Sequence, residues 1–243
     1  MMPALVVAAK NTKIVMEQAN IPQLEKYIEQ TILKSDLTKS ELAVFCHEAV
    51  SYGFYAVCIP PYFVKFVKSI LPKDKVKIVT VVGFPMGYQS IPVKVEEAKR
   101  ALEDGADEID AVMNIAALKS QEYEHVKEGI DAIATYCRLK SKVIKIIIES
   151  SLLSDEEIIK ACEICAEIGV DFVKTSTGFF GGASPEHVRL MREHLPPKIK
   201  IKASGGIRDA AFAIKLIEAG ADRIGTSSGV KMVGAETEID ENY

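Results

Sequence analysis

The sequence predicts a single (β/α)8 barrel, the TIM-barrel fold, on three observations. Short apolar segments alternate with amphipathic ones from residue 38 onward, which indicates parallel strands joined by helices. Eight such units fit the 243 residues, a usual size for this barrel. A doubly wound sheet is the rival fold, but no GxGxxG motif follows an early strand.

The predicted strands are rich in β-branched residues and often end at glycine or proline. They cover residues 26–32, 55–60, 75–84, 108–113, 143–149, 171–174, 199–202 and 222–225. The first of them is the weakest, and its pattern also fits a helix.

The predicted helices begin at capping residues. Thr38 and Glu41 have the spacing of a capping box, Ser154 can cap a second helix, and Pro185 suits the first position of a third. The helices cover residues 38–53, 62–71, 93–104, 116–139 (as one helix or two), 154–168, 184–194 and 207–219.

We expect one domain over residues 1–243, with the barrel core at about 22–233 and a short N-terminal extension. Residues 1–9 are apolar but lack the basic start and the length of a signal peptide. No segment approaches the ~18 apolar residues of a membrane span. The net charge of −4 disfavours a nucleic-acid surface. The sequence therefore predicts neither a membrane nor a nucleic-acid partner.

The five scattered cysteines are typical of a reducing compartment, so we expect a cytoplasmic protein. Cys162 and Cys165 form a CxxC, but their context has helical periodicity, which favours a buried helix face over a redox or metal role. The four histidines fall on predicted helices, and no His, Asp and Glu set has ligand spacing. We expect no metal and no cofactor.

Charged residues follow the apolar cores of four consecutive strands. Asp110, Lys145, Lys174 and Lys202 belong to predicted strands four to seven. Functional groups of such barrels gather at the carboxyl ends of the strands, and buried charges need partners or a function. A solvated strand end would explain one lysine, but three lysines and an aspartate at one barrel mouth favour catalysis. One ammonium beside another favours loss of a proton and formation of a nucleophilic amine.

Small residues follow the last three strands, as Thr177-Gly178, Gly205-Gly206 and residues 225–228 (GTSS). Glycines allow backbone N–H groups to approach an anion, and barrels often bind phosphate after strands seven and eight. The pattern predicts a phosphate site.

These motifs together resemble the deoxyribose-phosphate aldolases of the DeoC family, which are class I (Schiff-base) aldolases. The likeness extends over residues 27–229. It rests on residues 107–114 (DEIDAVMN), 172–178 (FVKTSTG), 202–208 (KASGGIR) and 225–229 (GTSSG), with support from 56–61 (AVCIPP) and 80–87 (TVVGFPMG).

The resemblance implies catalytic roles for three residues. Lys174 would form the Schiff base, Lys202 would be its neighbouring ammonium, and Asp110 would take part in the proton relay. The expected substrate-binding residues are Cys58 (not as a nucleophile), Thr80, Lys145, Thr177, Gly178, Gly205, Gly206, Arg208, Ser227 and Ser228.

The implied reaction is the reversible cleavage of 2-deoxy-D-ribose 5-phosphate to glyceraldehyde 3-phosphate and acetaldehyde. A Schiff-base aldolase for a phosphorylated ketose and a non-catalytic phosphosugar-binding barrel are the alternatives. The family also implies a homo-oligomer, either a dimer or a tetramer.

The chain departs from the family pattern near the first strand. Many members read YIDHTLLK there, whereas this chain has YIEQTILK, with Glu29 and Gln30 in place of Asp and His. Phe179 and Phe180 supply no cation to the phosphate loop. A family use of a C-terminal tyrosine in the active site is open to Tyr243, with a disordered acidic tail as the alternative.

Overall fold

The computed structural model describes residues 23–234. The N-terminal extension expected at residues 1–9 and the C-terminal Tyr243 lie outside the described residues, so the predictions made for them are not tested.

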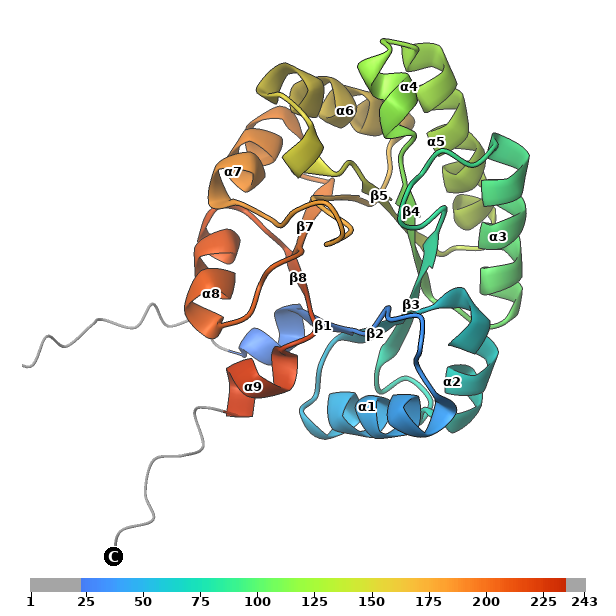
Figure 1. Ribbon diagram of the computed structural model, residues 1–243, viewed down its shortest axis with the longest axis vertical. Coiled ribbons are helices and arrows are strands. Elements are labelled where there is room, and N and C mark those ends of the chain that lie inside the picture. Colours follow the sequence, from blue (N-terminus) through green and yellow to red (C-terminus); the bar gives the residue numbers. More distant parts are fainter. Residues whose placement is uncertain (1–22, 235–243) are drawn as a thin grey trace, which may run out of the picture.

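Eight parallel strands close into a barrel in which each strand pairs with the next and the last pairs with the first (Figure 1). The strands are β1 (Ile28–Thr31), β2 (Ala56–Ile59), β3 (Lys77–Val82), β4 (Glu108–Val112), β5 (Val143–Ile147), β6 (Phe172–Lys174), β7 (Lys200–Ser204) and β8 (Arg223–Thr226). The predicted (β/α)8 fold is confirmed.

The helices form an outer ring around this barrel (Figure 1). They are α1 (Lys39–Ser51), α2 (Val64–Ile70), α3 (Ile91–Glu103), α4 (Ile115–Lys119), α5 (Tyr123–Leu139), α6 (Asp155–Ile168), α7 (Pro185–His194), α8 (Ala210–Glu218) and α9 (Gly229–Gly234). The described residues also form three 3-10 turns: Leu24–Tyr27 before β1, Pro61–Phe63 between β2 and α2, and Ser150–Leu152 between β5 and α6.

The weakly predicted first strand is a strand, preceded by one of these turns. The segment 116–139 forms two helices, because Gln121 takes a left-handed conformation between them (φ 60°). Helix α9 was not predicted, since it is short and has glycine at both ends.

Local sequence signals set the helix starts. At α1, the Thr38 hydroxyl accepts from the Glu41 N–H while the Glu41 carboxylate accepts from the Thr38 N–H. Ser154 and Glu157 form the same reciprocal pair at α6. Each box satisfies N–H groups that have no partner within the helix, which typically stabilises it by ~1 kcal/mol.

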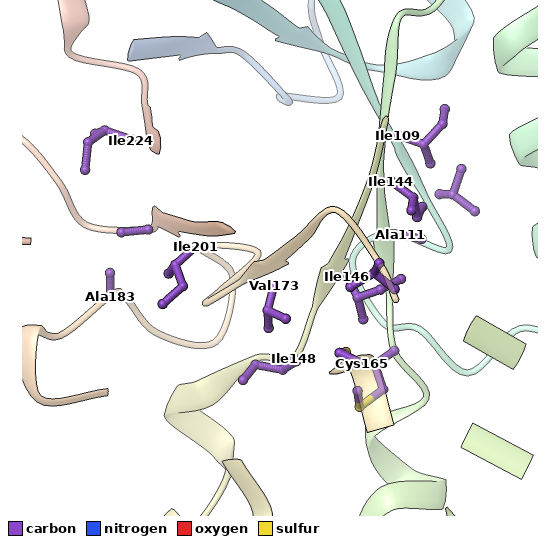
Figure 2. Close-up of a cluster of buried hydrophobic side chains, with 14 of the residues drawn as sticks. Ile109, Ala111, Ile144, Ile146, Ile148, Cys165, Val173, Ala183, Ile201 and Ile224 are labelled. Carbon is purple, nitrogen blue, oxygen red and sulfur yellow. The ribbon is translucent and has the colours of Figure 1, made fainter. Parts of the chain in front are cut away.

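The main hydrophobic core lies between the barrel and the helices. Figure 2 shows outward-facing strand residues such as Ile146, Val173 and Ile201 packed there, together with Cys165 of α6. Cys162 and Cys165 are both buried free thiols, which confirms the buried helix face predicted for the CxxC.

Because side chains alternate along a strand, the residues next to these isoleucines and valines point into the lumen. The inward positions include a small apolar layer formed by Ala56, Cys58, Val79 and Val81. They also include seven buried charged residues: Glu29, Glu108, Asp110, Lys145, Lys174, Lys202 and Arg223. The fold thus places an outer apolar core around an ionic lumen.

Candidate active site

Asp110 lies at the centre of the buried charges. Its Oδ2 accepts hydrogen bonds from the ammonium groups of both Lys174 (2.8 Å) and Lys202 (2.7 Å). Its Oδ1 accepts from Lys145 at 2.9 Å. Lys174 and Lys202 are direct partners in the register of β6 and β7, which brings both amines to one carboxylate.

The three lysines differ in the number of carboxylates that they contact. Lys145 contacts Asp110 and also Glu108 (2.6 Å) and Glu29 (3.5 Å). Lys202 contacts Asp110 and Glu29. Lys174 is ion-paired to Asp110 alone among the described residues. It is also the only one of the three lysines that lines the open cavity above the network.

Glycine at position 225 makes room for Lys202. Residue 225 of β8 lies between β7, which carries Lys202, and β1, which carries Glu29. A Cβ atom at Gly225 would lie 2.9 Å from Cε of Lys202. The missing side chain therefore lets the lysine cross β8 and reach the Glu29 carboxylate.

The charges hold one another in their ionised forms. Burial alone would raise the pKa of Asp110, but Lys145, Lys174 and Lys202 hold it well below its ordinary value. Glu29 likewise has a lowered pKa, because Lys145 and Lys202 outweigh its burial. Burial opposes the charge of Lys202 and Lys145, yet the neighbouring carboxylates raise the pKa of both ammonium groups.

The ionic groups of the lumen do not balance. Four cations (Lys145, Lys174, Lys202 and Arg223) face three carboxylates (Glu29, Glu108 and Asp110). With every group ionised, the network carries one excess positive charge in a buried environment, where unpaired charge is costly. Among the described residues, Lys174 is the lysine of this network with the fewest ion pairs.

Arg223 and Tyr55 bound the network at the amino-terminal end of the barrel strands. The Arg223 guanidinium stacks on the Tyr55 ring at 3.3 Å from its centroid and donates to Glu29 at 3.2 Å. The Tyr55 hydroxyl donates to Glu108 at 2.7 Å. These contacts orient the carboxylates that hold Lys145 and Lys202.

A cavity of about 390 Å³ opens beyond Lys174. Its walls come from segments after β1, β6, β7 and β8 and include the predicted Thr177, Gly178, Gly205, Gly206, Arg208 and Ser227. Within residues 23–234, the charged side chains of this lining are Lys34, Lys174 and Arg208, with no carboxylate among them. The cavity is therefore suited to an anion.

Glycines allow the loops of this cavity to pack closely. Gly178 and Gly205 have left-handed backbones (both φ 89°), and a Cβ at Gly205 would lie 2.8 Å from the Gly181 carbonyl oxygen. The Gly205 carbonyl accepts from the Ala183 N–H at 3.1 Å. The Glu149 carboxylate fixes the same loop by accepting from the Thr177 N–H at 3.0 Å.

Four expected substrate-binding residues do not line the cavity: Cys58, Thr80, Lys145 and Ser228. Lys145 is fully buried in the ionic network instead. The Thr80 hydroxyl donates to the Ile59 carbonyl at 2.8 Å, and its neighbours Val79 and Val81 take the inward positions of β3. The Ser228 N–H donates to the Thr226 hydroxyl at 2.9 Å, so this donor is already used. Cys58 faces the lumen but is fully buried, and burial raises its pKa, which fits a thiol that is not a nucleophile.

Sequence reasoning missed Glu108, Arg223, Tyr55 and Lys34 as parts of this region. It left the role of Glu29 in doubt, whereas the structure gives Glu29 ion pairs with Lys202, Lys145 and Arg223. Gln30 does not enter the network; its Oε1 accepts from the Gly229 N–H at 3.0 Å. The available signal was a charged residue within an apolar strand, as Glu29 is in the first strand and Arg223 in the last.

Within residues 23–234, no group of three or more His, Cys, Asp or Glu side chains is placed to hold a metal ion. The helices in this part of the chain are all too short or too polar to cross a bilayer.

Barrel and site together define a (β/α)8 protein with a lysine-rich lumen. The model of the DeoC/LacD family aldolases matches residues 24–234, and the chain belongs to this family.

Several aldolases match this chain over nine-tenths or more of their own length. A deoxyribose-phosphate aldolase of Thermococcus kodakarensis is 52% identical over 217 residues, covering 88% of this chain and 97% of the relative. The structure described as "QR15, an Aldolase" is 47% identical, with a TM-score of 0.83, over 88% of this chain and 96% of that one. The tetrameric deoxyribose phosphate aldolase of Aeropyrum pernix is 33% identical, with a TM-score of 0.81, over 87% and 90%.

Proposed function

We propose that the protein cleaves 2-deoxy-D-ribose 5-phosphate reversibly to D-glyceraldehyde 3-phosphate and acetaldehyde, through a Schiff base on Lys174. The family and the relatives named deoxyribose-phosphate aldolase support this reaction. The observation that carries it is the shared contact of Lys174 and Lys202 with one oxygen of Asp110, beside a cationic cavity.

Lys174 is suited to be the nucleophile, because it lines the cavity and has the fewest carboxylate partners. Its neutral amine attacks the C1 aldehyde, and loss of water gives the iminium. Lys202, held by Asp110 and Glu29, stays an ammonium and supplies the positive charge beside the forming iminium.

The iminium withdraws the electrons of the C2–C3 bond. A base removes the proton of the C3 hydroxyl, the bond breaks, and glyceraldehyde 3-phosphate leaves with a new carbonyl group. The remaining enamine is protonated at C2, and water releases acetaldehyde and the free amine. Asp110, which touches both lysines, is placed to move these protons with Lys202 and water.

The cavity supplies the groups for the phosphate. Gly178, Gly205, Gly206, Arg208 and Ser227 line the cavity. Backbone N–H groups of the glycines, with the Arg208 and Ser227 side chains, would hold the phosphate. Anchoring the phosphate there positions C1 at Lys174, which lowers the entropic part of the barrier.

Reductive trapping tests the Schiff base. Borohydride with acetaldehyde should add a two-carbon group to Lys174, identified by peptide mass spectrometry, and Lys174→Ala should lose both adduct and cleavage. Lys65→Ala, an exposed lysine of α2, is the matched control and should keep both. Active protein without an adduct at Lys174 would reject this proposal.

We also propose that the protein is a cytoplasmic homo-oligomer. The five buried free thiols fit a reducing compartment, and a tetrameric relative supports self-association. Light scattering of the full chain gives the oligomeric state, and fractionation of its source cells gives the compartment.

A further inference from the structure

The cavity beside Lys174 has a cation that sequence reasoning did not assign. Lys34 follows β1 and lines the same space as Gly178, Gly205 and Arg208. The nearby stretch after β6 lines the cavity with Thr177, Gly178 and Phe179 and so brings no charge. The Phe179 ring instead packs edge-on against Phe84, with ring centroids 5.4 Å apart.

Lys34 is held in an exposed ion pair. Its ammonium donates to Glu41 Oε1 at 2.9 Å and lies 3.9 Å from Asp36, with 44% of the lysine side chain exposed. Exposed pairs of this kind are weak, because water competes for both charges. The lysine can therefore change partner at little cost.

The Glu41 carboxylate is held in position by contacts other than its ion pair with Lys34. Its other carboxylate oxygen, Oε2, accepts from the N–H of Thr38 at 2.8 Å and from its hydroxyl at 2.6 Å, as part of the α1 capping box. These contacts keep the carboxylate at the helix start whether or not the lysine is bound. Glu41 is thus a fixed competitor for the Lys34 ammonium.

We propose that Lys34 is a phosphate-binding residue that exchanges Glu41 for the substrate phosphate. The inference rests on the proposed function and adds a specificity residue to it. A phosphate dianion offers a lysine a stronger, charge-assisted partner than a solvated carboxylate. Lys34 would supply a cation that the loop after β6 lacks, and Glu41 would set how tightly the phosphate is held.

Binding of inorganic phosphate, measured by calorimetry on the full chain, tests the exchange directly. Lys34→Met should weaken phosphate binding by about tenfold, the scale of one lost hydrogen bond to a charged group. Lys39→Met is the matched control: it removes the same charge five residues on, from a lysine over the Phe66 ring and outside the cavity lining. It should change binding less than twofold.

Glu41→Gln tests the competitor. Glutamine also serves in a capping box, so α1 keeps its N-terminal contacts. Loss of the competing charge should tighten phosphate binding by roughly two- to fivefold. In the double variant with Lys34→Met this gain should vanish; a gain that persists would show that Glu41 acts without Lys34 and would overturn the exchange.

Kinetics separate this inference from the proposed function. Lys34→Met should raise KM for deoxyribose 5-phosphate more than it lowers kcat, and it should reduce kcat/KM more for the phosphosugar than for unphosphorylated deoxyribose. If the wild type cleaves the phosphosugar and Lys34→Met matches Lys39→Met, Lys34 has no phosphate role and the function stands. A second outcome is that Glu41→Gln binds phosphate more tightly and Lys34→Met more weakly than the wild type, while neither the wild type nor a variant cleaves the phosphosugar. The proposed reaction is then wrong, and the phosphate role of Lys34 stands.

Discussion

Glu29 and Lys202 form an ion pair inside the barrel, although 173 residues separate them in the chain. Their strands flank β8, and Gly225 leaves the space through which the lysine reaches the carboxylate. The replacement of the family's aspartate by a longer glutamate therefore does not remove the acidic partner of Lys202. The carboxylate also holds Arg223, which ties the network to the first and the last strand.

Glu29→Gln should destabilise the protein by about 3–5 kcal/mol, since it leaves buried cations without a carboxylate. Urea unfolding at pH 7 measures the loss. Glu96→Gln removes a carboxylate that is 71% exposed and 3.7 Å from Lys99, and it should change stability by less than ~0.5 kcal/mol. Equal effects of the two substitutions would contradict a structural role for the buried pair.

Gly225→Ala should displace Lys202, because the new methyl group would meet its Cε atom at 2.9 Å. The position does not need a left-handed backbone, so side-chain displacement is the main effect. We expect kcat for deoxyribose 5-phosphate cleavage to fall by about 10²-fold or more, the contribution of a positioned acid–base group.

Gly129→Ala is the control for this substitution. A Cβ there would lie 3.6 Å from Ile91, an ordinary contact, and helical alanine is favoured over glycine. Full activity of Gly225→Ala would show that the Lys202–Glu29 contact is dispensable.

Acid should destabilise the protein through its buried carboxylates. The pKa of Asp110 lies well below its ordinary value of 3.8 and that of Glu29 below 4.5 in the folded protein, because buried lysines stabilise the anions against the effect of burial. The unfolded chain therefore binds more protons as the pH falls below 4.5, and the stabilisation is lost through the lower folded values.

Urea unfolding at pH 6, 4 and 3 measures this dependence. Asp110→Asn cannot take up that proton, so its stability should fall less between pH 4 and pH 3 than that of the wild type. Parallel losses in the two proteins would mean that Asp110 does not carry the acid sensitivity.

Lys94 should also make the protein more stable as the pH rises, but in alkaline rather than acid solution. Burial lowers the pKa of this lysine to about 8, and its amine donates to the carbonyls of Gly87 (2.6 Å) and Val112 (3.0 Å). Between pH 8 and its ordinary value of 10.5, the unfolded chain binds more protons than the folded one, so this lysine makes the protein more stable as the pH rises. The gain is about 3 kcal/mol at most.

Lys94→Met removes this titration but keeps an unbranched side chain. The stability of the wild type relative to the variant should rise between pH 8 and pH 10, as measured by urea unfolding at each pH. A constant difference would show that Lys94 stays protonated in the fold throughout this range.

Much of the barrel could be predicted from the sequence, because short β-branched apolar segments and capping residues are local signals. The meeting of Asp110, Lys174 and Lys202 was also predictable, since parallel strands bring their carboxyl ends to one mouth. The role of Arg223 was not predictable, because this residue lies at the start of its strand and not at the carboxyl end. Its contacts with Tyr55 and Glu29 exist only once the last strand pairs with the first.

Other details depend on tertiary structure alone. The sequence placed Gly225 in a phosphate-binding loop. Only the structure shows that the absence of a Cβ atom there makes room for the Lys202 side chain. The inward or outward direction of Thr80 depends on strand register, which the sequence of a fully buried strand does not determine. Lys34 lies in the loop after β1, where the sequence has no helix or strand periodicity from which the direction of a side chain could be predicted.

The ionic network takes residues from six of the eight strands, including the first and the last. During synthesis, Glu29 and Asp110 emerge long before Lys202 and Arg223, so an incomplete barrel holds these carboxylates without two of their cations. The contact between Arg223 and Glu29 and the passage of Lys202 beside Gly225 both require β8 to join β1. Catalytic competence should therefore appear in a single late step of folding, and recovery of activity would report closure of the barrel.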